Sequence, residues 1–181
     1  KRKNFCVSRS FGKKLTELLK LEEAVATYCL NAAEKIMGDK QLCRRITVFI
    51  RTSPFNKNRK YYSNGKTIDL PIATSNSIEL IKNAKKALNA IYKSGYHYQK
   101  VGIILSRLSD LDSNDNHLLT PLLEKKSKKL MEAIDHTNMK YGRHAISIAN
   151  AGISKGWKMR REHSSKIDTA SFDYLPKITA S

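Results

Sequence analysis

The chain has little of the chemistry on which secreted, zinc-binding and membrane proteins rely. Its 181 residues include three cysteines and no C-x-x-C pair, so neither a disulfide framework nor a cysteine-based zinc site is expected. No apolar run approaches the ~20 residues of a membrane span, and no secretory signal sequence is visible. We therefore expect reduced thiols, a cytoplasmic location and no membrane partner.

Motifs of catalysis are also missing. The sequence contains neither a phosphate-binding loop, nor a dinucleotide-binding glycine motif, nor the paired histidines of a zinc protease. Asp110, Asp112 and Asp115 lack the glycine and the closing glutamate of a calcium loop. No serine or cysteine lies in a recognisable nucleophile motif. The residues therefore give no candidate catalytic, cofactor-binding or metal-ligating group.

Acidic residues are scarce as well, because 34 lysines and arginines face only 16 aspartates and glutamates, for a net charge of +18. Such an excess indicates a polyanionic partner, above all a nucleic acid. The stretch best suited to it is residues 8–14, SRSFGKK. Hydroxyl groups, backbone N–H groups beside a glycine and basic side chains all donate to phosphate oxygens. A basic strand end without a ligand would have the same composition.

Hydrophobic periodicity predicts the order β-α-β-β-α-β in the first part of the chain. Asn64-Gly65 is typical of a tight turn, Pro71 should end the third strand, and Asn76 with Glu79 can form a capping box for the second helix. The expected strands are 4–11, 43–52, 67–70 and 98–106, and the expected helices are 21–37 and one between Asn76 and Gly95.

This order predicts an α+β fold, with one four-stranded sheet and two helices on one face. The other sheet face should then be open to solvent. We expect Arg9, Arg51 and Lys100 at strand ends on that open face.

The sequence changes character after the last expected strand, which divides the chain into 1–108, 109–124 and 125–181. Residues 109–124 are polar and begin with an acidic stretch without periodicity, so we expect a linker. Residues 125–181 are too few to bury much core alone, so we expect this tail to dock on another surface.

The tail begins with a helical pattern at 125–141, closed by Gly142. A weak alternation over 144–149 is compatible with a strand. The predicted apolar face of the helix holds Leu130, Ile134 and Tyr141.

Several segments in combination resemble the C-terminal part of the UmuC family, the catalytic subunits of bacterial DNA polymerase V. The first 108 residues resemble the little-finger domain of Y-family translesion DNA polymerases. The segments that carry the resemblance are 8–12, 32–35, 52–55, 61–64, 87–95, 98–102, 142–143, 152–153 and 157–161.

The resemblance implies the DNA-binding and partner-binding C-terminal region of an error-prone polymerase of SOS mutagenesis, associated with the nucleoid. The chain starts at Lys1 without a methionine, so we expect a piece of a longer protein. The polymerase site and its Mg²⁺ would lie in a palm domain upstream, which leaves this piece non-enzymatic and without a cofactor. Its little finger would hold template–primer duplex by the backbone. The residues that match this role are Ser8, Arg9, Ser10, Gly12, Lys13, Arg51 and Lys100.

The resemblance also implies protein partners. The family carries a sliding-clamp motif with a glutamine and a leucine–phenylalanine pair, and both the glutamine and the phenylalanine are absent from residues 117–123. Weak clamp binding is therefore expected, through Leu118, Leu119, Leu122 and Leu123. The alternative is a linker whose leucines pack on the tail.

The family's tail is implicated in binding a UmuD-type subunit and the RecA filament. By resemblance, this role falls on Trp157, Met159, Arg160 and Arg161. Tryptophan and arginine are enriched at protein interfaces. Internal packing of Trp157 against the helix at 125–141 is the alternative.

Two rival classes remain. A stand-alone RNA-binding module of ferredoxin-like topology would share the β-α-β-β-α-β order, although its K/R-G-F/Y-G/A-F-V-x-F/Y signature is missing. A metabolic α+β enzyme is disfavoured by the charge and by the lack of a site motif.

Overall fold

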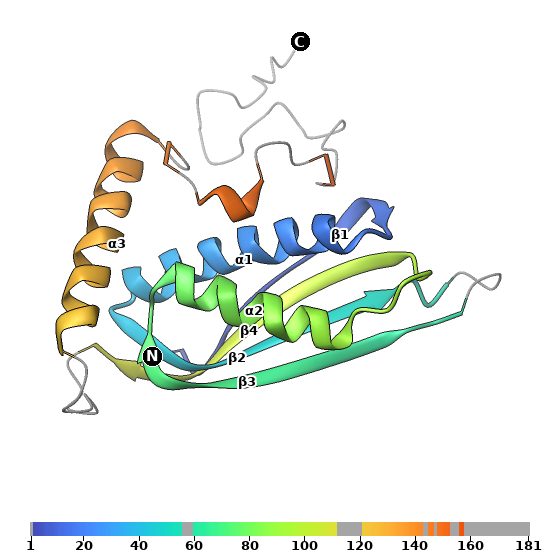
Figure 1. Cartoon of the computed structure of the whole chain (residues 1–181), viewed down its shortest axis with the longest axis horizontal. Coiled ribbons are helices and arrows are strands. Elements are labelled where there is room, and N and C mark those ends of the chain that lie inside the picture. Colours follow the sequence, from blue (N-terminus) through green and yellow to red (C-terminus); the bar gives the residue numbers. More distant parts are fainter. Residues whose placement is uncertain are drawn as a thin grey trace, which may run out of the picture.

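A computed structural model of the chain describes residues 2–55, 60–111, 121–142, 145–146, 148–152 and 156–157. It confirms the predicted α+β fold, in which two helices cover one face of a four-stranded antiparallel sheet (Figure 1). The elements are β1 (Phe5–Leu15), α1 (Leu18–Gly38), β2 (Gln41–Thr52), β3 (Ser63–Thr74), α2 (Ser77–Ile91), β4 (Tyr98–Asp110), α3 (Pro121–Tyr141) and the 3-10 helix η1 (Ala149–Ala151).

The sheet has the strand order β1-β4-β2-β3. The last strand, β4, lies between β1 and β2 and pairs antiparallel with both. Its register with β2 is continuous from Gln41 opposite Asp110 to Arg51 opposite Lys100. The connection through α1 therefore leaves a gap between β1 and β2 that β4 fills, and β1 and β3 form the edges.

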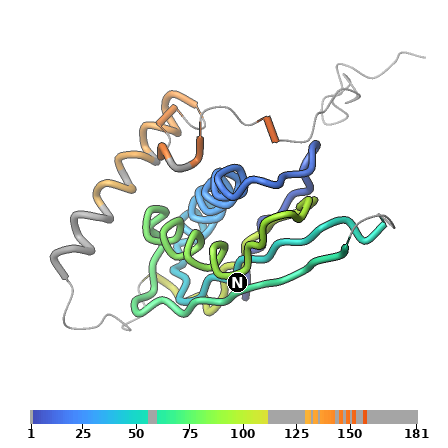
Figure 2. Tube along the Cα trace, turned by 45° about the vertical axis from the view of Figure 1, so that its right-hand side comes forward, coloured from blue at the N-terminus to red at the C-terminus, as the bar shows by residue number. Residues whose placement is uncertain are grey.

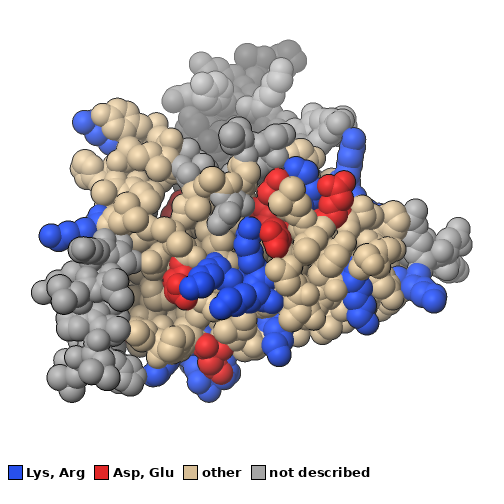
Figure 3. Space-filling view, in the orientation of Figure 1, with Lys and Arg blue, Asp and Glu red and all other residues tan. Residues whose placement is uncertain are grey.

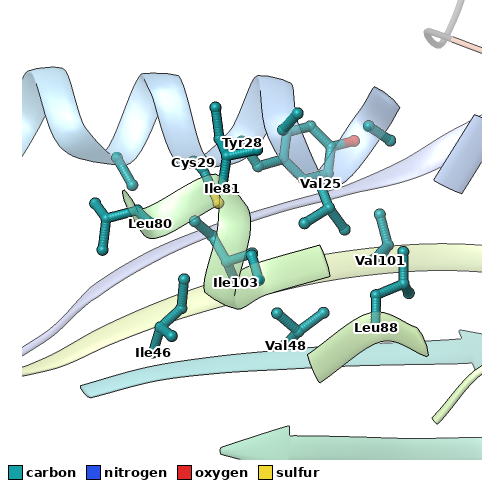
Figure 4. Close-up of a cluster of buried hydrophobic side chains, with 14 of the residues drawn as sticks. Val25, Tyr28, Cys29, Ile46, Val48, Leu80, Ile81, Leu88, Val101 and Ile103 are labelled. Carbon is teal, nitrogen blue, oxygen red and sulfur yellow. The ribbon is translucent and has the colours of Figure 1, made fainter. Parts of the chain in front are cut away.

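The core lies between the sheet and the two helices (Figure 4). In the middle of β2 and β4 the large apolar residues at every second position are buried there, and in the helices the buried residues recur at spacings of three and four. Figure 2 shows α1 and α2 side by side over one face, and no described element covers the other. The fully buried side chains include Leu21, Val25, Cys29, Ile46, Val48, Ile50, Leu80, Ile81, Leu88, Val101, Ile103 and Leu105.

β3 differs most from its prediction, because it is twelve residues long rather than the expected 67–70. Asn64 and Gly65, which we expected in a tight turn, pair with β2 inside the strand. Pro71 does not end β3. An edge strand tolerates proline, because its outward N–H positions have no partner to lose.

Other element ends lie beyond their predicted positions. β1 continues to Leu15, β4 to Asp110, and α3 begins at Pro121. The expected linker 109–124 therefore contributes its first residues to β4 and its last four to α3, while 112–120 lie outside the described residues. The division of the chain into domains stays a prediction.

The cap of α2 is partly as predicted. Asn76 accepts a hydrogen bond from the Ile78 N–H through its side chain (2.8 Å). The Asn76 N–H, which a capping box would direct to Glu79, donates to Thr74 Oγ1 (3.0 Å). The Glu79 carboxylate accepts from Asn83 Nδ2 (2.9 Å). α2 ends at Ile91, before the expected Ser94-Gly95.

The tail elements differ from their prediction in detail. Leu130 and Tyr141 are exposed, and Met131 is the buried contact of α3, where it accepts a hydrogen bond from Ser77 Oγ (3.2 Å). Ile134, half-buried, lines a small hollow together with Met131, so the predicted apolar face was right for Ile134 and wrong for Leu130 and Tyr141. Gly142 follows the helix with φ +100°, as expected of a helix end. Ala149 begins η1 rather than lying in a strand.

None of the helices in the described part of the chain is long and apolar enough to cross a membrane.

The packing predicts unequal thiol reactivity. Cys6 is exposed, whereas Cys29 and Cys43 are buried. Burial raises the pKa of Cys43 to about 12 and raises the pKa of Cys29 as well. At mildly alkaline pH, a thiol-exchange reagent such as DTNB should react rapidly with Cys6 alone. Cys6→Ser should abolish this fast phase, and a second fast-reacting thiol in the folded chain would contradict the burial of Cys29 or Cys43.

Candidate nucleic-acid interface

The antiparallel register decides which side chains share the open sheet face. Directly opposed residues of an antiparallel pair lie on the same face. Val101 and Ile103 of β4 face the helices, so the alternate residues Lys100 and Gly102 face the other way. Following the pairing across all four strands gives one polar row, Ser10–Lys100–Arg51–Ser63, on the open face.

Two cations meet at the centre of this polar row. Lys100 and Arg51 are directly opposed on the two central strands, a placement of like charges that destabilises a sheet. None of the ion pairs among the described residues involves either of them. An anion bound over the row would relieve the repulsion. The flanking hydroxyls of Ser10 and Ser63 could donate to the same anion.

A second basic group lies further along the same face and was missed by the sequence analysis. Asp69 accepts from Arg45 Nε (2.7 Å) and Nη2 (3.0 Å), and Arg107 Nη1 lies 3.4 Å from its Oδ1. The Arg45 hydrogen bond holds the pKa of Asp69 below its usual value, with smaller contributions from the charges of Arg45, Arg107 and Arg44. Two guanidinium groups share one carboxylate, so this arginine pair stays net positive.

The two basic groups are spaced along β2. Arg45 and Arg51 lie six residues apart on the same face, which corresponds to about 20 Å of strand. The major groove of a duplex is about 12 Å wide. Basic groups at this spacing can therefore contact phosphates on both sides of a groove. Between Arg45 and Arg51 along β2, Thr47 shares a hydrogen bond with Thr67 of β3 (2.8 Å).

Phe49 shapes the middle of the face. A Cβ atom added to Gly102 would lie 2.4 Å from Phe49 Cζ and 2.5 Å from Ser8 Cβ. The ring therefore extends from β2 over β4 toward β1, and Gly102 provides the space for it. Phe49 is the single aromatic residue on this face within the described strands. Its place was visible in the alternation of β2, but the sequence analysis did not use it.

The structure separates the residues of the predicted β1 motif. Ser8 and Ser10 lie on the open face, as expected. Arg9 pairs with the core residue Val101, so it lies on the helix side of the sheet, and its expected place beside Arg51 and Lys100 was wrong. The reason is the strand period of two, which places Arg9 with Phe5 and Phe11. Arg9 is exposed at the sheet edge.

The pKa of Tyr28 is consistent with the position of Arg9 on the helix side. Burial raises the pKa of Tyr28 to about 12, and the positive charge of Arg9 acts in the opposite direction to a smaller extent. Tyr28 belongs to α1, so this effect supports the assignment of Arg9 to the helix side.

Gly12 does not offer the free amide that we expected. Its N–H donates to the Trp157 carbonyl (3.3 Å). Lys13, next in the chain, is exposed. Of the seven residues predicted to contact DNA, the structure therefore brings Ser8, Ser10, Arg51 and Lys100 together on one face.

Trp157 is buried, with 4 % of its surface exposed. Its ring packs edge-on against Phe11 (6.1 Å between centroids) and Tyr28 (5.8 Å). Of the two alternatives, Trp157 thus packs internally, but against β1 and α1 rather than against the helix at 125–141. Its Nε1 and the Tyr28 hydroxyl are buried and have no hydrogen-bond partner among the described residues.

The remaining predicted partner residues are not placed in detail. Leu118, Leu119, Met159, Arg160 and Arg161 lie outside the described residues. Leu122 and Leu123 belong to the first turn of α3. Within the part of the chain that the structure describes, no cluster of histidine, cysteine and carboxylate side chains could hold a metal ion.

The Phe49–Gly102 contact predicts a specific stability defect. Gly102→Ala should lower the free energy of unfolding by about 1–3 kcal/mol, because the new methyl group overlaps the Phe49 ring and Ser8. Urea denaturation followed by circular dichroism measures the change. Gly102→Ala should cost less in a Phe49→Ala background, and an equal cost in both backgrounds would show that the ring is not the obstacle.

The packing of Trp157 predicts a larger defect. Trp157→Ala should lower the free energy of unfolding by about 3–5 kcal/mol, since it leaves a cavity between Phe11 and Tyr28. Tyr141→Ala on exposed α3 is the matched aromatic control and should cost less than about 0.5 kcal/mol. Equal losses in the two variants would contradict the docking of the tail on β1 and α1.

Two family models match different parts of the chain. The family model described as the impB/mucB/samB family C-terminal domain matches residues 2–120. A second model, a domain of unknown function (DUF4113), matches residues 128–178.

Two bacterial proteins are similar over most of the chain. Protein UmuC of Salmonella typhimurium strain LT2 is 36% identical over 172 residues, which cover 94% of this chain and 41% of that protein. Protein ImpB of Salmonella typhimurium is 35% identical over 170 residues, which cover 93% of this chain and 40% of that protein. The chain thus spans about two fifths of the length of these curated relatives.

A solved structure described as a complex of the beta-clamp processivity factor and the little finger domain of PolIV is also similar. The TM-score is 0.43 and the sequence identity 16%, over 66% of this chain and 98% of that chain.

Proposed function

This chain belongs to the impB/mucB/samB family, and from that premise we propose that its open sheet face binds duplex DNA through the phosphate backbone, as the C-terminal region of a translesion DNA polymerase. The observation that carries the proposal is the polar row Ser10–Lys100–Arg51–Ser63. Its two central cations are opposed and have no carboxylate partner among the described residues.

The distribution of charge supports the same face. On the helix side, acidic and basic side chains lie close together (Figure 3). Lys20 pairs with Glu23 and Lys85 with Glu22, both at 3.0 Å. The four strands contain only Asp69 and Asp110 as carboxylates, and both lie far along the sheet from Arg51. Among the described strands and helices, the positive charge is therefore less compensated on the uncovered sheet face than on the helix side.

The mechanism that this face supports is positional. Lys100 and Arg51 would neutralise phosphates of one strand, and the arginine pair around Asp69 would contact the other side of the groove. Contacts of this kind fix the position of a duplex and carry no base information. Binding would thus be independent of sequence, as a protein that follows a moving primer end requires.

Catalysis is assigned to the rest of the parent protein. We propose that the palm domain and its Mg²⁺ ions lie in the part of the relatives' length that this chain does not span. Segment 112–123, with its leucines, would bind the sliding clamp weakly, and the end of the tail, with Arg160 and Arg161, would contact the UmuD-type subunit and the RecA filament. These assignments rest on the family resemblance.

The proposal predicts the behaviour of one double variant. Arg51→Gln with Lys100→Gln should weaken binding to two unrelated duplexes equally, and should lower the slope of log affinity against log salt by about two. Fluorescence anisotropy over a salt series measures both. The folded state should lose no stability, because the variant removes two opposed like charges.

The matched control is Lys82→Gln with Lys129→Gln, which removes the same charge from exposed positions on α2 and α3. It should change the salt slope by less than half as much. Equal slopes in the two double variants would show that overall charge, and not the polar row, binds the duplex.

A further inference from the structure

A polar cleft of about 560 Å³ lies at one end of the molecule, outside the open sheet face. Its wall comes from the end of β1, from the connection between β2 and β3, and from the connection between α2 and β4, which meet at the same end in Figures 1 and 2. Clefts that bind small ligands have volumes of about 300–1,000 Å³. The lining residues include Lys14, Thr52, Lys60, Gly95, Tyr96 and His97.

The cleft is positively charged. Lys14 and Lys60 are exposed at its rim, and none of the described residues that line it is acidic. No carboxylate in the described part of the chain forms an ion pair with either lysine. A ligand of this cleft should therefore carry negative charge.

The floor of the cleft is aromatic and firmly held. Tyr96 packs on Tyr62, with 4.8 Å between ring centroids. The Tyr62 hydroxyl donates to the Ile91 carbonyl (2.6 Å), and its main chain pairs with Thr52. The Tyr98 hydroxyl, beside this pair of rings, bonds both the N–H and the carbonyl of Lys93. Tyr96 thus packs against rings whose hydroxyls are hydrogen-bonded to the main chain.

Two exposed aromatic residues lie close in the sequence to residues that line the cleft. Tyr61 follows the rim residue Lys60 and is 57 % exposed, and Phe55 follows Ser53 of the wall by two residues and is 91 % exposed. Exposed rings among lysines are a surface that stacks bases while it neutralises phosphates. The open face of the described strands lacks this combination, since its one aromatic ring, Phe49, is packed over Gly102.

We propose that this cleft binds single-stranded DNA, with a base stacked on Tyr96 or Tyr61 and the adjoining phosphates on Lys14 and Lys60. The cleft lies at the end of the sheet where the polar row lies, because Thr52 of its wall follows Arg51 in β2. Adjacent strand residues point to opposite faces, so a strand that leaves a duplex held on the sheet face would pass around this end of the sheet to reach the cleft. The site is distinct from the duplex site and can bind without it.

The test compares two probes on the 181-residue chain, a labelled oligothymidylate of about twelve nucleotides and a labelled hairpin duplex. Lys14→Gln with Lys60→Gln should weaken oligothymidylate binding about tenfold, and Tyr61→Ser by a similar factor. The controls are Lys82→Gln with Lys129→Gln for charge and Tyr141→Ser for an exposed ring. Circular dichroism melting verifies that each variant folds.

The outcomes separate this proposal from the duplex site. Preferential loss of oligothymidylate binding in the cleft variants supports it, and Arg51→Gln with Lys100→Gln should show the reverse preference. If cleft and control variants lose oligothymidylate binding equally, the cleft is not the site. If the cleft variants lose duplex binding to the same extent, the two surfaces are one site and the proposal is wrong. A duplex affinity unchanged by the Arg51 and Lys100 substitutions would overturn the sheet-face proposal alone.

Discussion

The insertion of β4 between β1 and β2 is the constraint on which the rest of this structure depends. One unbroken register, from Gln41 opposite Asp110 to Arg51 opposite Lys100, sets both faces of the sheet at once. It places Ile46, Val48 and Ile50 beside Val101, Ile103 and Leu105 under the helices. A shift by one residue would turn every one of these side chains to solvent. Burial of the core therefore fixes the position of each charge on the opposite face.

The same register imposes an unfavourable contact, because it sets Lys100 against Arg51 and neither forms an ion pair with a carboxylate among the described residues. On the helix side, by contrast, Lys20 and Lys85 each form an ion pair with a glutamate. Opposed cations on a bare sheet are tolerated because the core on the other face supplies the stability. An anionic ligand is the natural complement of such an arrangement.

The tail is tied to the sheet through its single tryptophan. Trp157 fills the space between Phe11 and Tyr28, and its carbonyl takes the Gly12 N–H. Composition alone left packing and partner binding open for this residue, since tryptophan suits both. Its burial means that any partner contact of the tail must use other residues. Phe11 and Gly12 lie in the strand that also carries Ser8 and Ser10, so tail and open face share one element.

Local patterns determined the order of elements, the α+β class and the presence of an uncovered basic face. The reason is that apolar residues recur at a spacing of two in the strands and of three to four in the helices. The strand period also indicates the correct side for Arg9, because its spacing from Phe5 and Phe11 places it on the same face as those core residues, despite its charge. The extent of β3 through Pro71, the sharing of Asp69 by Arg45 and Arg107, and the cleft of Lys14, Lys60 and Tyr96 were decided only by the tertiary structure. Each of these features depends on which strand lies at the edge of the sheet or on contacts between segments far apart in the chain. Local sequence patterns contain no information on either.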